Sequence, residues 1–269
     1  MQKQAIILIA LVFPFLLSAQ ADHWDVYLAK YDKGAGSTML NMSLKKVAPV
    51  KGLPFVVIAG VTYKDCQADG FPGERELARL YIISDSIKAH MDNIVHNNIL
   101  AGTFTYQCDR VDYYYIADTS RIRQELTFLI NRQFPGYVPY INIKADPGWE
   151  GYLHFLYPNE TILEHMENQR LVMKLSQAGD KLDKPRKTDH WLYFTTKTDR
   201  DCFIRYALVK KFKIEKSDTA INNLHPYPLH LSRIDKVDMQ SINTLTHELR
   251  KQAELCKGEY DGWETFVVK

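Results

Sequence analysis

The sequence predicts an α+β protein made of two α/β-sandwich domains, each with a ferredoxin-like βαββαβ core. Three observations support this prediction. The chain has 269 residues, 46% of them hydrophobic and 25% charged, which is the composition of a globular protein long enough for two cores. Strand-like and helix-like segments follow one another in the order βαββαβ, and the order occurs twice. A polar stretch with a proline, residues 179–188, is the expected linker.

The first residues of the chain have the layout of a secretory signal peptide. Lys3 is followed by an apolar run over residues 5–17 and then by the small, polar residues 18–21. The run is shorter than the roughly 20 residues that span a bilayer, and it contains Pro14. An uncleaved N-terminal anchor is the alternative. We therefore expect residues 1–21 to be a signal peptide and the protein to be exported, periplasmic or secreted, with no membrane segment after cleavage.

The predicted first domain, residues 22–180, begins with two strands and continues with a βαββαβ run. Apolar residues recur at helical spacing in the helices, and alternating or continuous apolar runs mark the strands. Asp109-Arg110 is the expected hairpin turn. The predicted strands are Trp24–Tyr31, Thr38–Leu44, Phe55–Ala59, Gly102–Gln107, Val111–Ala117, Tyr140–Lys144 and Trp149–Tyr157. The predicted helices are Glu74–His96, Arg121–Asn131 and a third from Asn159 to Gln177.

The predicted second domain, residues 181–269, contains one βαββαβ run. Thr198 and Asp201 have the spacing of a capping box at the start of its first helix. Asp238 is expected to cap the second helix, whose apolar residues recur at helical spacing. The predicted strands are Asp189–Thr196, Phe212–Lys216, Leu224–Ile234 and Glu259–Val268.

Four cysteines, Cys66, Cys108, Cys202 and Cys256, fall two in each predicted domain. They form no C-x-x-C pair, so neither a zinc ribbon nor a thioredoxin-like motif is supported. An oxidising compartment allows three pairings, and four separate buried thiols are the alternative. Because the two helices of a βαββαβ unit run antiparallel, the start of the first helix lies near the end of the second. Cys202 lies in the opening turns of the first helix and Cys256 at the end of the second, which leads to the hypothesis of a disulfide Cys202–Cys256. Cys66 follows the first strand of its unit and Cys108 ends the strand after the helix, at the same edge of the layer, which leads to the hypothesis of a disulfide Cys66–Cys108.

The C-terminal residues 258–264, G-E-Y-D-G-W-E, resemble the G-[DE]-Y-D-G-W ending of the regulator of ribonuclease E activity B family. Residues 189–194, D-H-W-L-Y-F, also resemble that family's opening strand. The first half is similar to the domain of unknown function 695. That similarity rests on the strand-loop-helix with Gly70, Pro72 and Glu74, and on D-P-G-W-E-G-Y at residues 146–152.

The resemblance implies a protein that binds and regulates a protein partner and has no chemistry of its own. The chain departs from the regulator B family in its signal peptide, in its additional first domain, and in its near-neutral charge where that family often has acidic segments. The resemblance therefore implies the fold and the binding character, and the ribonuclease is not carried over as the partner.

A candidate binding patch lies in the C-terminal segment. Gly262 would permit a bulge or a positive φ that re-aims the indole of Trp263. In that interpretation Tyr260 and Trp263 form an aromatic recognition patch surrounded by carboxylates. In the alternative, Trp263 anchors the core and Asp261 is a turn residue. The candidate residues are Glu259, Tyr260, Asp261, Gly262, Trp263 and Glu264.

The histidines form no recognised catalytic or metal motif. His247-Glu248 lacks the second histidine of H-E-x-x-H, because residue 251 is a lysine. His225 and His230 are five residues apart, which places them on opposite faces of a regular strand. The sequence has no G-x-S-x-G elbow, P-loop or dinucleotide fingerprint. We therefore expect no catalytic residue, no cofactor and no metal.

Charge and motif content favour a protein partner over nucleic acid. The 34 Lys and Arg nearly balance 32 Asp and Glu, for a formal charge of +2. Nucleic-acid binders usually carry a strongly basic surface, and the RNA-recognition signature is absent. We therefore expect no nucleic-acid binding.

The function expected from the sequence is an exported, non-catalytic protein-binding or regulatory module. One alternative is a hydrolase with a His/carboxylate site between the domains, for which His154, His190 and Glu259 would have to converge in a deep pocket. Another is an immunity-type inhibitor of a secreted toxin. A shallow aromatic face around Trp263 would favour the binding module.

Overall fold

The structure is a computed structural model that describes residues 22–217 and 226–269. The predicted signal peptide, residues 1–21, and His225 lie outside the described residues. The chain divides into two compact units, with the division between Tyr157 and Pro158. Each unit is an α+β structure with one antiparallel sheet, of six strands in the first unit and four in the second.

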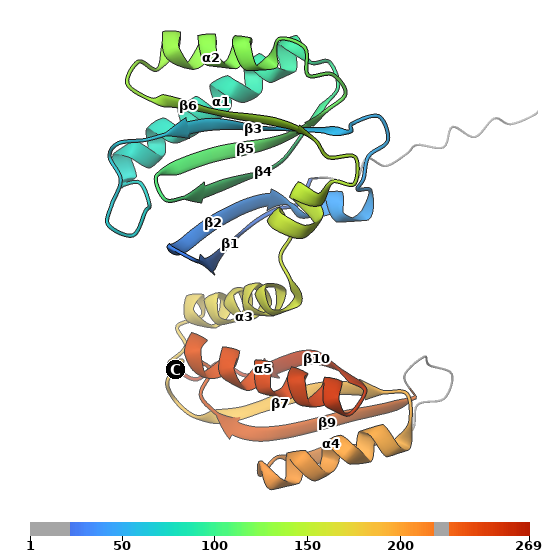
Figure 1. Cartoon of the computed structure of the whole chain (residues 1–269). Helices are drawn as coiled ribbons and strands as arrows, with labels where there is room; N and C mark the ends of the chain where they lie inside the picture. The colour runs from blue at the N-terminus through green and yellow to red at the C-terminus, as the bar shows by residue number, and fades with distance from the viewer. Residues whose placement is uncertain (1–21, 218–225) are drawn as a thin grey trace, which may run out of the picture. The chain divides into compact units, whose positions relative to one another are not determined.

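The sheet of the first unit has the order β1-β2-β4-β5-β3-β6 (Figure 1). Its strands are β1 (Trp24–Tyr31), β2 (Gly34–Asn41), β3 (Phe55–Thr62), β4 (Asn98–Tyr106), β5 (Asp109–Ile116) and β6 (Val138–Ala145). Helices α1 (Glu74–Ile94) and α2 (Ile122–Gln133) pack on one face of this sheet. Alternate residues of the central strands, such as Val57 and Ala59 of β3, are fully buried in that core.

The opposite face of the first sheet is contacted by the short helical segment η2 (Gly151–Leu156), whose Phe155 packs on Phe104 of β4 and Tyr113 of β5. A second short helix, η1 (Met42–Lys46), follows β2 and contacts β1. The predicted strand Trp149–Tyr157 is therefore wrong, because most of this segment is the π-helical η2. The carboxylate of Asp146 accepts hydrogen bonds from the backbone N–H groups of Glu150 and Gly151 and from the hydroxyl of Tyr115. These bonds cap the first turn, so the D-P-G-W-E-G-Y motif has a structural role.

The second unit begins with α3 and continues with a βαββαβ run whose sheet has the order β10-β7-β9-β8. Its elements are α3 (Glu160–Gln177), β7 (Arg186–Phe194), α4 (Lys197–Val209), β8 (Lys213–Lys216), β9 (Tyr227–Asp235), α5 (Met239–Leu255) and β10 (Gly258–Thr265). Helices α4 and α5 cover one face (Figure 1). Asp238 caps α5 as predicted, whereas α4 is capped by Thr196, two residues before the predicted Thr198.

The division between the units differs from the predicted boundary after residue 180. Helix α3 belongs to the second unit, where Val172 enters the core. Glu164 of α3 accepts a 2.8 Å hydrogen bond from Arg250 of α5. The expected linker, residues 179–188, is also packed: buried Asp180 pairs with Arg186, which begins β7, and accepts from the backbone of Val268. Local composition cannot reveal these long-range contacts, which explains the difference.

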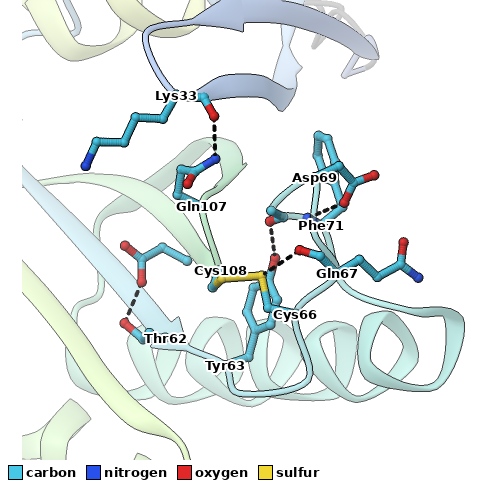
Figure 2. Close-up of a disulfide and its surroundings, with 11 residues drawn as sticks. Lys33, Thr62, Tyr63, Cys66, Gln67, Asp69, Phe71, Gln107 and Cys108 are labelled. Carbon is cyan, nitrogen blue, oxygen red and sulfur yellow. Dashed lines mark hydrogen bonds between the residues drawn. A yellow bond between two sulfur atoms is a disulfide. The ribbon is translucent and has the colours of Figure 1, made fainter.

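The two disulfides join the cysteine pairs named in the sequence hypothesis. Cys66–Cys108 has a Cα–Cα distance of 5.5 Å, and Cys202–Cys256 one of 5.8 Å. The first ties the loop after β3 to the β4–β5 turn (Figure 2). Gly70 of that loop accepts a hydrogen bond from the backbone N–H of Cys108. That turn is Gln107-Cys108, both with positive φ, and so lies two residues before the predicted Asp109-Arg110.

No helix among the described residues is long and apolar enough to cross a membrane.

Candidate functional site

The four-stranded sheet of the second unit has two chemically different faces. Along β7, buried His190, Leu192 and Phe194 point toward α4 and α5. The alternate residues Trp191 and Tyr193 lie on the opposite face and are partly exposed. We call this opposite face the outer face and define it by Asp189, Trp191, Tyr193, Pro228, His230 and Glu264, which alternate with the core residues on β7, β9 and β10.

An aromatic stack forms the centre of the outer face. Trp191 of β7 and His230 of β9 are direct cross-strand partners, and their rings stack with centroids 4.8 Å apart and an interplanar angle of 8°. The Nε2 atom of His230 lies 2.7 Å from Oδ1 of Asp189. The carboxylate therefore fixes the imidazole against the indole, and the stack is a preorganised aromatic surface.

Charged side chains surround the stack. Lys187 lies 2.8 Å from Asp189 and 3.3 Å from Glu215, so it links the two carboxylates. Partial burial opposes ionisation of Asp189, but its bonds with Lys187 and His230 outweigh that effect and hold its pKa below the usual range. Hydrogen bonds from Lys213 and Ser232 help to lower the pKa of Glu215 to about 2. Both carboxylates are thus ionised at neutral pH.

The candidate patch of the C-terminal segment is divided between the two faces. Tyr260 is buried and its hydroxyl lies 2.9 Å from Nδ1 of His190, while the indole of Trp263 packs on the core and donates to Asn168 of α3. A register shift between Tyr260 and Gly262 produces this arrangement, and Gly262 has a φ of +142°. Glu259, Asp261 and Glu264 are exposed. Tyr260 and Trp263 therefore lie on the core side of the sheet, whereas Glu259 and Glu264, which pair with Tyr193 and Asp189, lie on the outer face.

Gly258, the first residue of the same segment, is required by close packing. A Cβ atom at this position would lie 2.1 Å from the ring of Phe194. The glycine therefore lets the start of β10 pass directly over a core aromatic residue.

Comparison with known families identifies both halves of the chain. The profile described as Family of unknown function (DUF695) matches residues 22–157, and the profile Regulator of ribonuclease activity B (RraB) matches residues 165–265. The chain belongs to the DUF695 family. Its DUF695 domain is followed by an RraB domain, which confirms the resemblance of both halves.

Other comparisons are less informative. No curated protein matches the chain. The crystal structure of an unknown protein from Galdieria sulphuraria is 10% identical and is aligned over 79% of this chain and 97% of that one, with a TM-score of 0.22. A similarity of this size supports no structural or functional argument.

His190 of the RraB domain is a core residue. It is fully buried, and burial lowers its pKa to about 4, so the imidazole is neutral at physiological pH. Its two ring nitrogens lie near the hydroxyls of Tyr260 and Thr188, at 2.9 and 3.3 Å. Glu259 is paired with Tyr193 and lies on the outer face, whereas His190 lies on the core side of the same sheet. The two residues therefore do not form one acid/base site.

The remaining histidines raised by the sequence occupy exposed or partly exposed positions. His154 in the DUF695 domain lies 3.2 Å from Glu150, with both side chains mostly exposed. His247 is exposed on α5 of the RraB domain. Across the described residues, no three His, Cys, Asp or Glu side chains are grouped so that they would hold a metal ion.

Sequence reasoning missed Asp189, Trp191 and His230 as one site. The signal was present in D-H-W-L-Y-F, because strict alternation places Asp189, Trp191 and Tyr193 on the face opposite the core residues. The pairing of Trp191 with His230 required the β7–β9 register, which is a long-range property.

Proposed function

We propose that this protein is an exported, non-catalytic protein-binding or regulatory module, and that its RraB domain binds a protein partner on the outer face. The observation that carries the proposal is the Trp191–His230 stack held by Asp189. A partly exposed tryptophan on a rigid scaffold, surrounded by charged groups, is the composition of an interaction hot spot. The face offers a partner aromatic contact at its centre and ion pairs at its rim.

The family match supports a binding role. The matched description, Regulator of ribonuclease activity B, describes proteins that act by regulating another protein. For this chain we infer the regulatory mode and leave the ribonuclease out, because the layout of residues 1–21 predicts export. The partner we propose is therefore a protein of the exported compartment.

Export is further supported by the cysteines. All four form disulfides, and no free cysteine remains among the described residues. Disulfides persist in oxidising compartments and are rare in the cytosol.

We also propose that both units are ferredoxin-like. In the second unit the strands of the βαββαβ run lie in the order fourth, first, third, second, as given by β10-β7-β9-β8. The run that starts at β3 has the same order in β6-β3-β5-β4, and the β1–β2 hairpin extends its sheet beyond β4. Identical strand orders with both helices on one face support one architecture used twice.

The test is partner capture by the disulfide-intact chain from the exported fraction, with cross-linking and mass spectrometry. Trp191→Ala removes the centre of the outer face, and we expect it to weaken capture of the partner by about 30-fold or more, as for a hot-spot residue. Leu208→Ala is the matched control, because Leu208 is 58% exposed on α4, away from the outer face. If no protein is specifically retained, or if the two variants retain it equally, the proposal is wrong.

A further inference from the structure

The DUF695 domain has an edge strand that is chemically unlike the other sheet edges of the described chain. Strand β1 is eight residues long, lies at the edge of the six-stranded sheet (Figure 1) and pairs with β2 without a register shift. Two apolar side chains of this strand, Val26 and Leu28, are 54% and 67% exposed. A long, regular edge strand with exposed apolar side chains is a template for pairing with another strand.

The other three edges carry features that oppose such pairing. Strand β6 contains Pro139, which lacks an N–H donor. Strand β8 has only four residues, two of them lysines, and its register with β9 shifts. Strand β10 is interrupted by the shift between Tyr260 and Gly262. Natural sheets protect their edges with these devices. Strand β1 carries one exposed lysine, Lys30, but it has neither a proline nor a bulge nor a short length.

The backbone groups that β1 presents to solvent can be identified from its hairpin. Tyr31 and Gly34 flank the two-residue turn, so they form a hydrogen-bonded pair. Because hydrogen-bonded and non-hydrogen-bonded pairs alternate in an antiparallel ladder, the odd-numbered residues of β1 make the backbone hydrogen bonds to β2. The N–H and C=O groups of Trp24, Val26, Leu28 and Lys30 therefore point away from β2. In agreement, the Val26 N–H is bonded to the exposed carboxylate of its neighbour Asp25, at 2.8 Å.

We propose that two copies of this chain pair through β1, antiparallel about a two-fold axis at Tyr27, and join their six-stranded sheets into one. This register places Val26 opposite Leu28 of the partner and Trp24 opposite the partner's Lys30. The outward backbone groups of the two strands then satisfy one another, and the Asp25 carboxylate is displaced from the Val26 N–H.

A second copy fits this edge because the strand is self-complementary. About its midpoint, an apolar residue meets an apolar residue, and an indole meets a lysine, which is a favourable cation–π pair. Within β1 no like charges face each other, because this register places Asp25 opposite Ala29 of the partner copy. An isologous contact requires this kind of symmetry in the sequence.

The pairing is expected to be weak and to depend on concentration. Stable dimers usually bury about 1,200 Å² or more, and two eight-residue edges supply less. The contact lies within the DUF695 domain and does not involve the outer face of the RraB domain, so it stands independently of the proposed function.

Sedimentation velocity of the oxidised chain, residues 22–269, over about 1 to 200 μM tests the proposal. The unaltered chain is expected to shift from monomer to dimer across this range. Val26→Lys is expected to remain monomeric throughout. The matched control is Val138→Lys, because Val138 is also 54% exposed and lies on β6, the other edge of the same sheet. This control is expected to dimerise like the unaltered chain.

A second variant separates loss of pairing from loss of folding. Val26→Pro removes only the outward N–H, leaves the β2 pairing intact, and gives β1 the protection that β6 already has. It should abolish the dimer and leave the melting temperature within a few degrees of the unaltered protein. A chain that stays monomeric at the highest concentration, or a dimer that survives Val26→Lys and Val26→Pro, would overturn the proposal.

Discussion

The buried imidazole of His190 makes the stability of the RraB domain sensitive to mild acid. In the unfolded chain this histidine takes up a proton near its ordinary pKa of about 6.5. In the folded domain burial lowers its pKa to about 4. As the pH falls below 6.5, the unfolded state binds the proton first, so stability is lost progressively until about pH 4.

The size of this loss follows from the two pKa values. Between pH 7.5 and pH 5, the binding of one proton to the unfolded state lowers the free energy of unfolding by about 2 kcal/mol. Glu215 and Asp189 also have lowered pKa values, but carboxylates cost stability chiefly below about pH 4.5. The interval from pH 7.5 to pH 5 therefore isolates the histidine.

Pulsed hydrogen exchange of urea-equilibrated protein measures this loss for each domain separately, because peptides from α5 and α1 report on different cores. The free energy of unfolding reported by the α5 peptides should be about 2 kcal/mol lower at pH 5 than at pH 7.5. His190→Gln should remove most of that difference. His247→Gln, at an exposed position on α5, should leave the difference unchanged. If His190→Gln preserves the full loss, burial of His190 is not its cause.

Three further predictions follow from buried groups, close packing and the disulfides. Burial raises the pKa of Asp112, so the folded DUF695 domain binds its proton more readily than the unfolded chain. The unfolding transition reported by α1 should therefore move to higher urea as the pH falls from 7 toward the ordinary aspartate pKa of about 4, and Asp112→Asn should flatten this rise. Gly258→Ala should lower the unfolding free energy of the RraB domain by about 1–3 kcal/mol in urea titration, because its Cβ overlaps the Phe194 ring, whereas Glu259→Ala should change it by less than about 0.5 kcal/mol. Non-reducing peptide mapping should recover the Cys202 and Cys256 peptides as a disulfide-linked pair, and free thiols in the exported protein would contradict this expectation. Removing the disulfide, which closes a loop with a sequence separation of 54, should lower the free energy of unfolding by about 4 kcal/mol on a chain-entropy basis.

Much of the fold was predictable because its signals are local. The alternation in β7 and the Asp238 cap of α5 are visible in a few consecutive residues, and the structure has both. The segment 149–157 was mispredicted for the opposite reason. Its aromatic composition favours a strand. The carboxylate of Asp146, which is bonded to Tyr115 at a distance of 31 residues in sequence, accepts from the backbone of Gly151 and holds the start of the segment in a helical turn.

The candidate site was less predictable because one bulge reverses the faces of β10. Strict alternation would place Tyr260 and Gly262 on one face and Trp263 on the other. The register shift at Asp261 instead brings Tyr260 and Trp263 to the same side, against the core. The sequence indicated that Gly262 permits a bulge, but only the structure shows which face each aromatic side chain occupies.

Binding of a protein to the outer face can be tested by site-specific photo-cross-linking in the producing cell. A photoreactive residue at position 264 lies on β10 beside Asp189, and one at position 254 lies on α5, on the other side of the sheet. Both positions are exposed. We expect a discrete protein adduct from position 264 that is absent from position 254 and is lost with Trp191→Ala. Adducts from both positions alike, or from neither, would contradict it.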